Sequence, residues 1–220
     1  MSEERELPRL ERGKDLSRIF AFTDGVFAIA ITLLVLQIDV PAGITSDADL
    51  WSSLKDEAPD LLAFAISFWV IGMYWVGSHR FMRTVDEYDR GLMVLTLGYL
   101  AFVVLVPFTS QLMGEYTTEA PLAMVFYIAN LVIVAIWSAL MQRHVLKAKL
   151  GKPEYSWDTE LGVKSTVFTA GLMALTAPFA FVLGPWTPVL WFLLRFDPYQ
   201  RRRDEIYKTK RAKPVKTPAA

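Results

Sequence analysis

Two ionisable side chains stand out because they lie in or beside apolar stretches of the sequence. Asp24 interrupts the run of residues 19–38, and His79 directly follows the run 61–78. A carboxylate near hydrocarbon is costly, so we expect Asp24 to face protein or water and to have a polar partner. Two roles remain open for Asp24: a hydrogen-bonded strut between helices, or a direct part in moving ions. Asp24 and His79 could also relay protons.

Arg18 is a basic residue in the turns just before Asp24. In an α-helix a separation of six residues is about 600° of rotation, which leaves the two side chains roughly 120° apart. They do not share a helix face, so we expect the partners of Asp24 to come from other helices.

The same segment carries two stripes of residues at helical spacing. One stripe recurs at intervals of three and four residues and consists of Phe22, Gly25, Ile29, Thr32, Leu33 and Leu36. The second stripe consists of Asp24, Ala28, Ile31 and Val35. Because the stripes lie on different sides of the helix, one can pack into its own subunit while the other meets symmetry-related copies. A row of apolar residues at helical spacing is also typical of ordinary packing or lipid contact.

Long apolar helices must position these residues. The chain is 53% hydrophobic and 21% charged, whereas soluble chains carry about 25% charged residues. A bilayer span needs about 20 apolar residues, and runs of that length predict an all-α integral membrane protein with six transmembrane helices. The predicted helices cover residues 19–38, 61–78, 91–113, 120–142, 166–183 and 186–196. The last two come from one uncharged run that is too long for a single span, and Gly184-Pro185 inside it is a turn signal.

The basic residues predict the orientation of these helices. With the N-terminus in the cytoplasm, 22 of the 23 Lys and Arg residues fall on the cytoplasmic side and only Lys55 falls outside, as the positive-inside rule requires. We therefore predict a multi-pass protein of the plasma membrane with both termini in the cytoplasm. Residues 1–17 form a cytoplasmic segment without the apolar region of a cleaved signal peptide, residues 18–196 the transmembrane domain, and residues 197–220 a basic, disordered tail.

The composition disfavours catalysis and metal binding. The chain has no cysteine and only two histidines, which excludes a thiolate metal site and disfavours a His-rich one. A membrane enzyme would need a nucleophile–base pair or metal ligands in a cavity. We expect no enzymatic activity, no cofactor, no metal ion and no nucleic-acid partner.

The segment around Asp24 resembles the first-helix signature of the transmembrane protein 175 family of potassium channels, in its bacterial branch. The match runs from Arg18 through Phe22-Thr23-Asp24-Gly25-Val26-Phe27-Ala28-Ile29 into Ile31-Thr32-Leu33-Leu34-Val35-Leu36. Thr23 stands where the family pattern has Ser, which keeps a hydroxyl and adds a methyl group. Trp75 and His79 follow in the second helix, although Ser78 replaces the first of a common His pair, and Val106-Pro107-Phe108-Thr109 ends the third.

The resemblance implies a homotetramer in which helix one lines a central pore. The narrowest point would be a ring of apolar side chains, matched here by Ile29 with Leu33 and Leu36, beside a hydroxyl layer at Thr32. Arg18, Phe22, Thr23, Asp24, Gly25, Trp75 and His79 would form a structural network behind this pore. The implied activity is passive conduction of cations, with potassium preferred, and the implied partners are potassium ions, further copies of the chain and the lipid bilayer.

Three alternatives compete with this hypothesis. A proton-permeable or proton-coupled cation transporter could use Asp24 and His79, although the sequence shows no inverted repeats or paired broken helices. A membrane enzyme is the second alternative, and a purely structural helix bundle is the third. Ion flux through the purified protein in liposomes would separate these possibilities.

Overall fold

The structure is a computed structural model that describes residues 9–117 and 119–212, and this part of the chain is almost entirely helical. The α-helices are α1 (Arg9–Leu33), α2 (Asp47–Asp56), α3 (Ala58–Met82), α4 (Arg90–Val104), α5 (Val106–Tyr116), α6 (Leu122–Ala148), α7 (Ser156–Thr176), α8 (Ala180–Leu183) and α9 (Pro198–Ala212). Short 3₁₀ segments are η1 (Leu34–Gln37), η2 (Pro153–Tyr155), η3 (Ala177–Phe179) and η4 (Gly184–Phe196). The predicted all-α membrane fold is confirmed.

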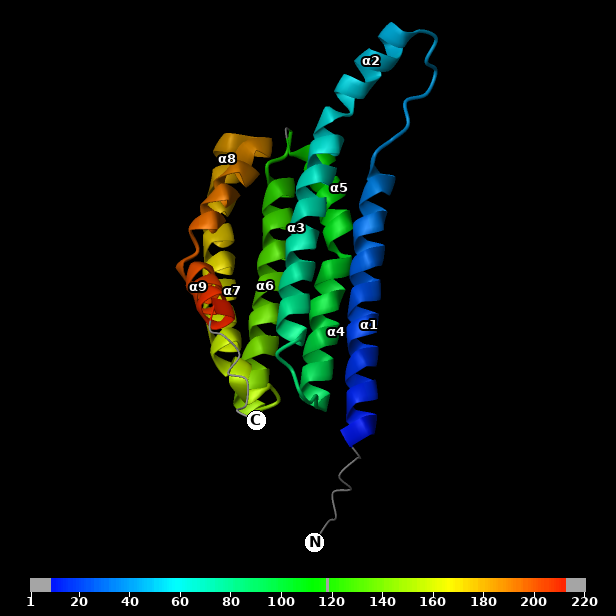
Figure 1. Ribbon diagram of the computed structural model, residues 1–220. Helices are drawn as coiled ribbons and strands as arrows, with labels where there is room; N and C mark the ends of the chain where they lie inside the picture. The colour runs from blue at the N-terminus through cyan, green and yellow to red at the C-terminus, as the bar shows by residue number, and fades with distance from the viewer. Residues whose placement is uncertain (1–8, 118, 213–220) are drawn as a thin grey trace.

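Five segments of the described chain are long and apolar enough to cross a membrane. They are Leu16–Gln37, Ala58–Met82, Arg90–Tyr116, Leu122–Ala148 and Pro153–Thr209. The long helices run side by side along one axis, and α1 stands at one edge of the bundle (Figure 1). A backbone in hydrocarbon must satisfy its own hydrogen bonds, which is why these apolar segments are helical throughout.

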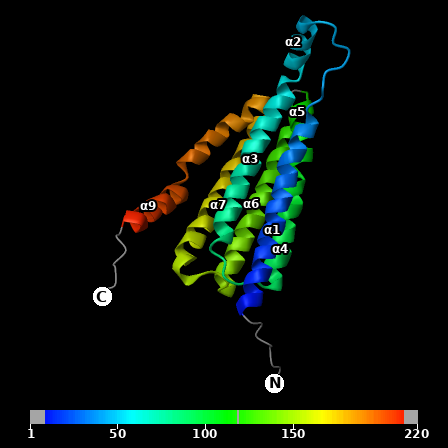
Figure 2. The same cartoon turned by 45° about the vertical axis from the view of Figure 1, so that its right-hand side comes forward.

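The fifth segment folds back on itself at Gly184. This residue has a φ of +52°, a left-handed conformation that glycine adopts without steric cost, and Pro185 cannot continue a preceding helix. The chain rises through α7 and α8, reverses and descends through η4 (Figure 2). The predicted hairpin is therefore present, with its first leg beginning at Ser156 and its second leg a 3₁₀ helix over Gly184–Phe196.

The third predicted helix, residues 91–113, is divided into α4 and α5. The break falls at Leu105, and Pro107 occupies the first turn of α5, where a missing N–H does no harm. The two helices continue as one apolar segment. Asp89 caps the start of α4 by accepting a hydrogen bond from Leu92 N at 2.7 Å.

Two polar segments outside the long apolar helices are helical. The segment between α1 and α3 contains α2, which begins where the Ser46 side chain accepts a hydrogen bond from Asp49 N. The prediction of a disordered tail over 197–220 is wrong for α9, which Asp197 caps by accepting hydrogen bonds from the N–H groups of Tyr199 and Gln200. Residues 213–220 lie outside the described chain. At the other end, α1 already begins at Arg9, inside the predicted segment 1–17.

The core of the bundle lies around α6. Tyr127, Leu131 and Val134 are completely buried, and α6 packs against α4, α5 and α7. Helix α1 packs on the other side of α4 and against α3, which leaves the rest of its surface uncovered within one chain.

Candidate functional site on helix α1

Helix α1 buries only one narrow face within the chain. Thr23, Phe27, Ala30 and Leu34, at spacings of three and four residues, are at most 2% exposed and form the packed face. Neither stripe predicted from the sequence coincides with it. In the second stripe Asp24, Ala28 and Val35 are exposed and Ile31 is half-buried. Lipid-facing and core-facing residues are both apolar, so periodicity alone could not tell which face packs inside the subunit.

The first stripe points away from the rest of the chain. Ile29 is 60% exposed and Leu36 is 75% exposed, and a Cβ added at Gly25 would meet no other atom within 4 Å. Phe22, Thr32 and Leu33 are exposed as well. The Thr32 hydroxyl donates to the Ile29 carbonyl at 2.9 Å, which keeps it close to the helix backbone. An apolar stripe this open requires a cover of lipid or of other protein chains.

A polar contact joins α1 to α3 beside this stripe. The indole Nε1 of Trp75 donates a hydrogen bond to Asp24 Oδ1 at 2.9 Å. The His79 ring lies one helical turn further along α3, with its centroid 5.7 Å from that of the Trp75 ring. The structure therefore places Trp75 in contact with both Asp24 and His79.

The other residues of the predicted network lie around this contact. Arg18 is exposed near the start of the apolar part of α1. Thr23 is buried, and within the described chain its hydroxyl has no hydrogen-bond partner. This feature could not be read from the sequence.

A second set of polar contacts lies inside the bundle, and its contacts between hydroxyl groups were not predicted. Ser67 donates to Ser110 Oγ at 2.7 Å and lies 2.9 Å from the hydroxyl of Tyr127. Asn130, which could be expected to bond between helices, donates to the Phe102 carbonyl at 3.3 Å. These buried contacts connect α3, α4, α5 and α6. Scattered hydroxyls in apolar helices give no periodic signal by which to find them.

The described residues contain no group of three or more His, Cys, Asp or Glu side chains that could hold a metal ion. The main feature of α1 is an exposed apolar stripe with the Asp24 carboxylate beside it.

Comparison with known proteins agrees with this geometry. The family described as the endosomal/lysosomal potassium channel TMEM175 matches residues 18–107. A potassium channel of Streptomyces collinus is 35% identical over 173 residues, which cover 73% of this chain and 84% of that protein. The chain belongs to the TMEM175 family. A potassium channel of Chamaesiphon minutus is 39% identical over 61% of this chain and 68% of its own length.

Solved structures extend the likeness to the fold of this TMEM175-family chain. The crystal structure of a lysosomal potassium-selective channel TMEM175 homologue from Chamaesiphon minutus superposes with a TM-score of 0.73 at 31% identity, over 87% of this chain and 99% of that one. Among animal relatives, a protein of Gallus gallus described as an endosomal/lysosomal proton channel is 30% identical over 64% of this chain and 32% of that protein.

Proposed function

We propose that four copies of this chain assemble around their α1 helices into a passive, potassium-preferring cation channel. The observation that carries the proposal is the open stripe of α1, in which Ile29 and Leu36 are largely exposed on a helix that packs through only one narrow face. A four-fold arrangement would cover this stripe with its own copies. Membership of a channel family and the likeness to the Chamaesiphon minutus structure support the same reading.

In this assembly, four copies of Ile29, Leu33 and Leu36 would form rings across the conduction path. Branched apolar side chains cannot replace the hydration shell of an ion, so such a ring acts by dewetting. An ion would pass after losing part of its water, and a larger cation loses water more easily. The Thr32 hydroxyl would supply a polar layer beside the rings, and the pore would prefer potassium to sodium modestly.

The contact between Asp24 and Trp75 would hold the pore-lining helix in place. The indole donor and the nearby His79 lie on α3, so the carboxylate ties α1 to a helix that packs deeper in the bundle. A hydrogen bond to a charged group is stronger than one between neutral groups. Asp24 would thus fix the position of α1 relative to α3, and it lies on a different face of α1 from Ile29.

Flux of potassium and sodium through the purified protein in liposomes tests the proposal. Ile29→Asn offers polar groups at the constriction, so we expect a larger potassium flux and weaker discrimination against sodium. Ile29→Ala should act in the same direction by widening the ring. The matched control is Val94→Asn on α4, where the parent side chain is 57% exposed and lies away from the proposed pore. Unchanged flux and selectivity in Ile29→Asn would show that Ile29 is not the constriction.

A proton-permeable channel or proton-coupled cation transporter is the second candidate, because Asp24 and His79 both contact the Trp75 side chain. In this case Asp24→Asn or His79→Ala would abolish acidification of liposomes that carry an internal pH dye while leaving potassium flux unchanged. If both residues are structural, the two variants instead lower the stability of the tetramer more than they change its selectivity.

We also place the channel in the plasma membrane with both termini in the cytoplasm. The support is the distribution of basic residues, 22 of 23 of which then lie inside. Because the chain has no cysteine, single cysteines can be labelled selectively in intact cells. A membrane-impermeant reagent should label position 46 and should miss positions 2 and 220. Labelling of position 220 from outside would contradict six crossings.

A further inference from the structure

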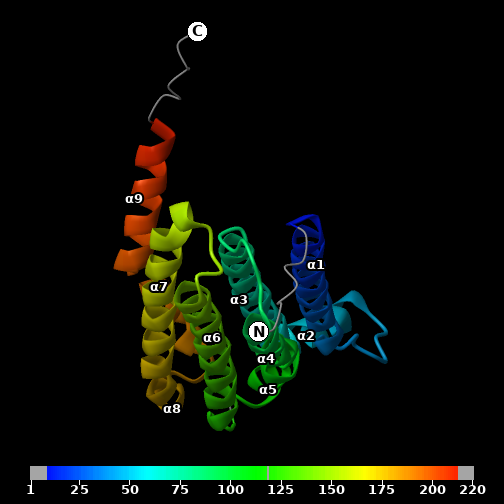
Figure 3. The same ribbon diagram turned by 90° about the horizontal axis from the view of Figure 1, so that it is seen from below.

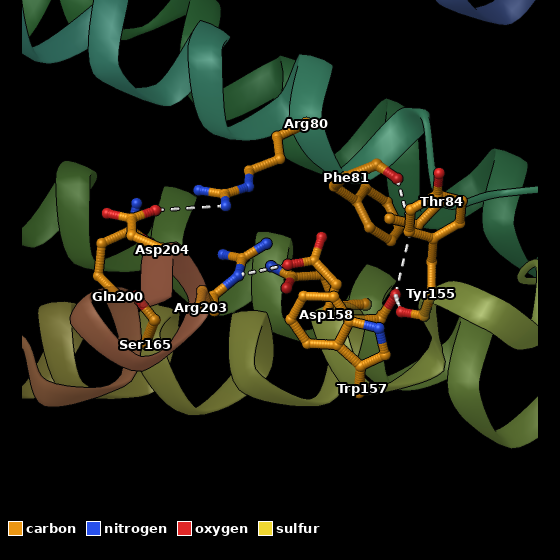
Figure 4. Close-up of polar contacts among 12 residues, drawn as sticks. Arg80, Phe81, Thr84, Tyr155, Trp157, Asp158, Ser165, Gln200, Arg203 and Asp204 are labelled. Atoms are coloured by element: carbon orange, nitrogen blue, oxygen red, sulfur yellow. Dashed lines mark hydrogen bonds and ion pairs between the residues drawn. The ribbon is translucent and has the colours of Figure 1, made fainter. Parts of the chain in front are cut away.

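Three helices meet in a closed set of polar contacts at the end of the bundle where α7 begins (Figure 4). Asp158 of α7 accepts a hydrogen bond from Arg203 Nε of α9 at 2.8 Å. Asp204, the next residue of α9, lies 3.4 Å from Arg80 Nη2 of α3. Thr159 Oγ1 donates to Thr84 Oγ1, just after α3, at 3.0 Å. Each helix is thereby connected to the other two. We call these six residues the clasp: Arg80, Thr84, Asp158, Thr159, Arg203 and Asp204.

The ion pair of Asp158 with Arg203 is the fixed part of the clasp. Asp158 is completely buried and Arg203 is 9% exposed. A buried carboxylate without its cation is strongly unfavourable, so this pair holds α9 against α7. A side chain at Gly162 would also collide with Gln142, since an added Cβ would lie 2.3 Å from Gln142 Oε1, and α7 and α6 are therefore packed closely beside the pair.

The contact of Arg80 with α9 is the adjustable part. The side chains of Arg80 and Asp204 are 26% and 53% exposed, and an ion pair this open contributes little to stability. The Arg80 guanidinium also lies 4.9 Å from the centre of the Tyr207 ring, a cation–π contact. Both partners of Arg80 belong to α9, so the position of Arg80 depends on where α9 lies.

Arg80 lies close to the residues that hold the pore helix. It directly follows His79, and Trp75, whose indole bonds Asp24, is five residues earlier on α3. Five residues are about 140° of rotation beyond one full turn, so Arg80 and Trp75 point to different sides of α3. In the view along the bundle, α3 lies between α1 on one side and the pair of α7 and α9 on the other (Figure 3).

We propose that Arg80 and Asp204 are positioning residues for conduction, through which the C-terminal helix α9 holds α3 and thereby the Trp75–Asp24 contact that places the pore stripe of α1. This inference rests on the proposed function, because it assigns a second set of residues to the same pore. The end of α3 is fixed on one side by α9 and bonded on the other side to α1. Without the contact between Arg80 and α9, α3 and α1 are held less firmly. The ring formed by the four Ile29 side chains is then less well defined, and the pore discriminates less between cations.

The test compares the ion pair between α9 and α3 with an ion pair on the surface of α7. Asp204→Asn removes the ion pair between α9 and α3, and Arg80→Gln removes both this ion pair and the cation–π contact with Tyr207. Glu160→Gln removes a surface ion pair within α7, in which Lys164 Nζ lies 2.7 Å from Glu160, and serves as the control because it does not involve α3. Each full-length protein is checked for its assembly and melting temperature, then assayed in liposomes for the ratio of sodium flux to potassium flux. This ratio does not depend on how much protein is correctly folded.

We expect Asp204→Asn and Arg80→Gln to raise the ratio of sodium to potassium flux at least twofold, with unchanged assembly and melting temperature. Glu160→Gln should keep the parental ratio, and so should Arg80→Lys, which retains the positive charge. Parental ratios in both Asp204→Asn and Arg80→Gln would overturn the positioning role while leaving the proposed function intact. A parent protein without potassium flux would overturn both.

Discussion

Helices α1 and α6 are both long and apolar, yet the fold uses them in opposite ways. In α6 the residues Tyr127, Leu131 and Val134 are completely buried among neighbouring helices. In α1 and the adjoining η1 only the narrow face through Phe27 and Leu34 is fully buried, and Ile29 and Leu36 are largely exposed within the single chain. The difference shows that apolar character in a membrane helix does not indicate core packing, because lipid and protein accept the same side chains.

The largest effect should come from placing an amide in the middle of α6. Leu131→Asn removes a fully buried leucine and leaves an amide without partners, which we expect to cost about 3–5 kcal/mol of stability. The same change at Ile29 of α1 should leave assembly intact, since the Ile29 side chain is exposed within a single chain. Size-exclusion chromatography and melting in detergent measure both variants. Equal destabilisation by the two variants would remove the distinction between α1 and α6.

A smaller effect should separate adjacent residues of α1. Ala30→Leu forces a larger side chain into the packed face, where Ala30 is 1% exposed, and overpacking costs about 1–3 kcal/mol. Ile29→Leu, one position away, conserves volume on the open stripe and should leave the melting temperature unchanged. If Ala30→Leu were as stable as the parent, the face through Phe27 and Leu34 would not be the packed one.

The contact across α1 and α3 should contribute about 1.5 kcal/mol, the lower end of the range for a hydrogen bond to a charged group, because Asp24 is exposed. Trp75→Phe keeps an aromatic ring beside His79 but removes the donor to Asp24. We expect a lower melting temperature of the assembled protein and a smaller change in cation selectivity than Ile29→Asn produces. A selectivity change as large as that of Ile29→Asn, at unchanged stability, would place Asp24 in the conduction path.

The smallest effect should appear at the start of α4, where Asp89 caps the helix and lies beside His144 of α6. Burial raises the pKa of Asp89, but the hydrogen bond from Leu92 N and the nearby His144 outweigh it, so the pKa lies below its ordinary value. A lowered pKa stabilises the fold above pH 3.8, the ordinary aspartate value, and this contribution disappears as the pH falls through the folded-state pKa. Asp89→Ala should therefore cost about 1 kcal/mol at neutral pH, the usual value of a helix cap.

Melting curves between neutral and acidic pH check this contribution. The difference between the parent and Asp89→Ala should shrink as the pH falls below the ordinary aspartate value. Asp89→Asn keeps a capping acceptor without a charge, so it should lie nearer the parent at neutral pH. A difference between parent and Asp89→Ala that stays constant down to acidic pH would show that the carboxylate charge is not involved.

The sequence by itself determined the helical membrane architecture and the residues of the candidate site. Uncharged runs longer than a bilayer span leave no other fold, and Gly184-Pro185 within the last run marks the reversal that the structure contains. The motif around Asp24 was recognisable because a carboxylate in an apolar run is costly and therefore conspicuous. Its association with Trp75 and His79 followed from the resemblance to the channel family.

Only the tertiary structure decided which face of α1 is packed, because all faces of that helix are apolar and periodicity cannot distinguish core from lipid. The tertiary structure also decided the conformation and the packing of the C-terminal segment. A basic sequence such as that of α9 predicts an unpaired tail, but Asp158, far away in the chain, provides a buried partner for Arg203. A contact between residues so distant in sequence leaves no local pattern. It exists only because the hairpin at Gly184 brings the end of the chain back against α7.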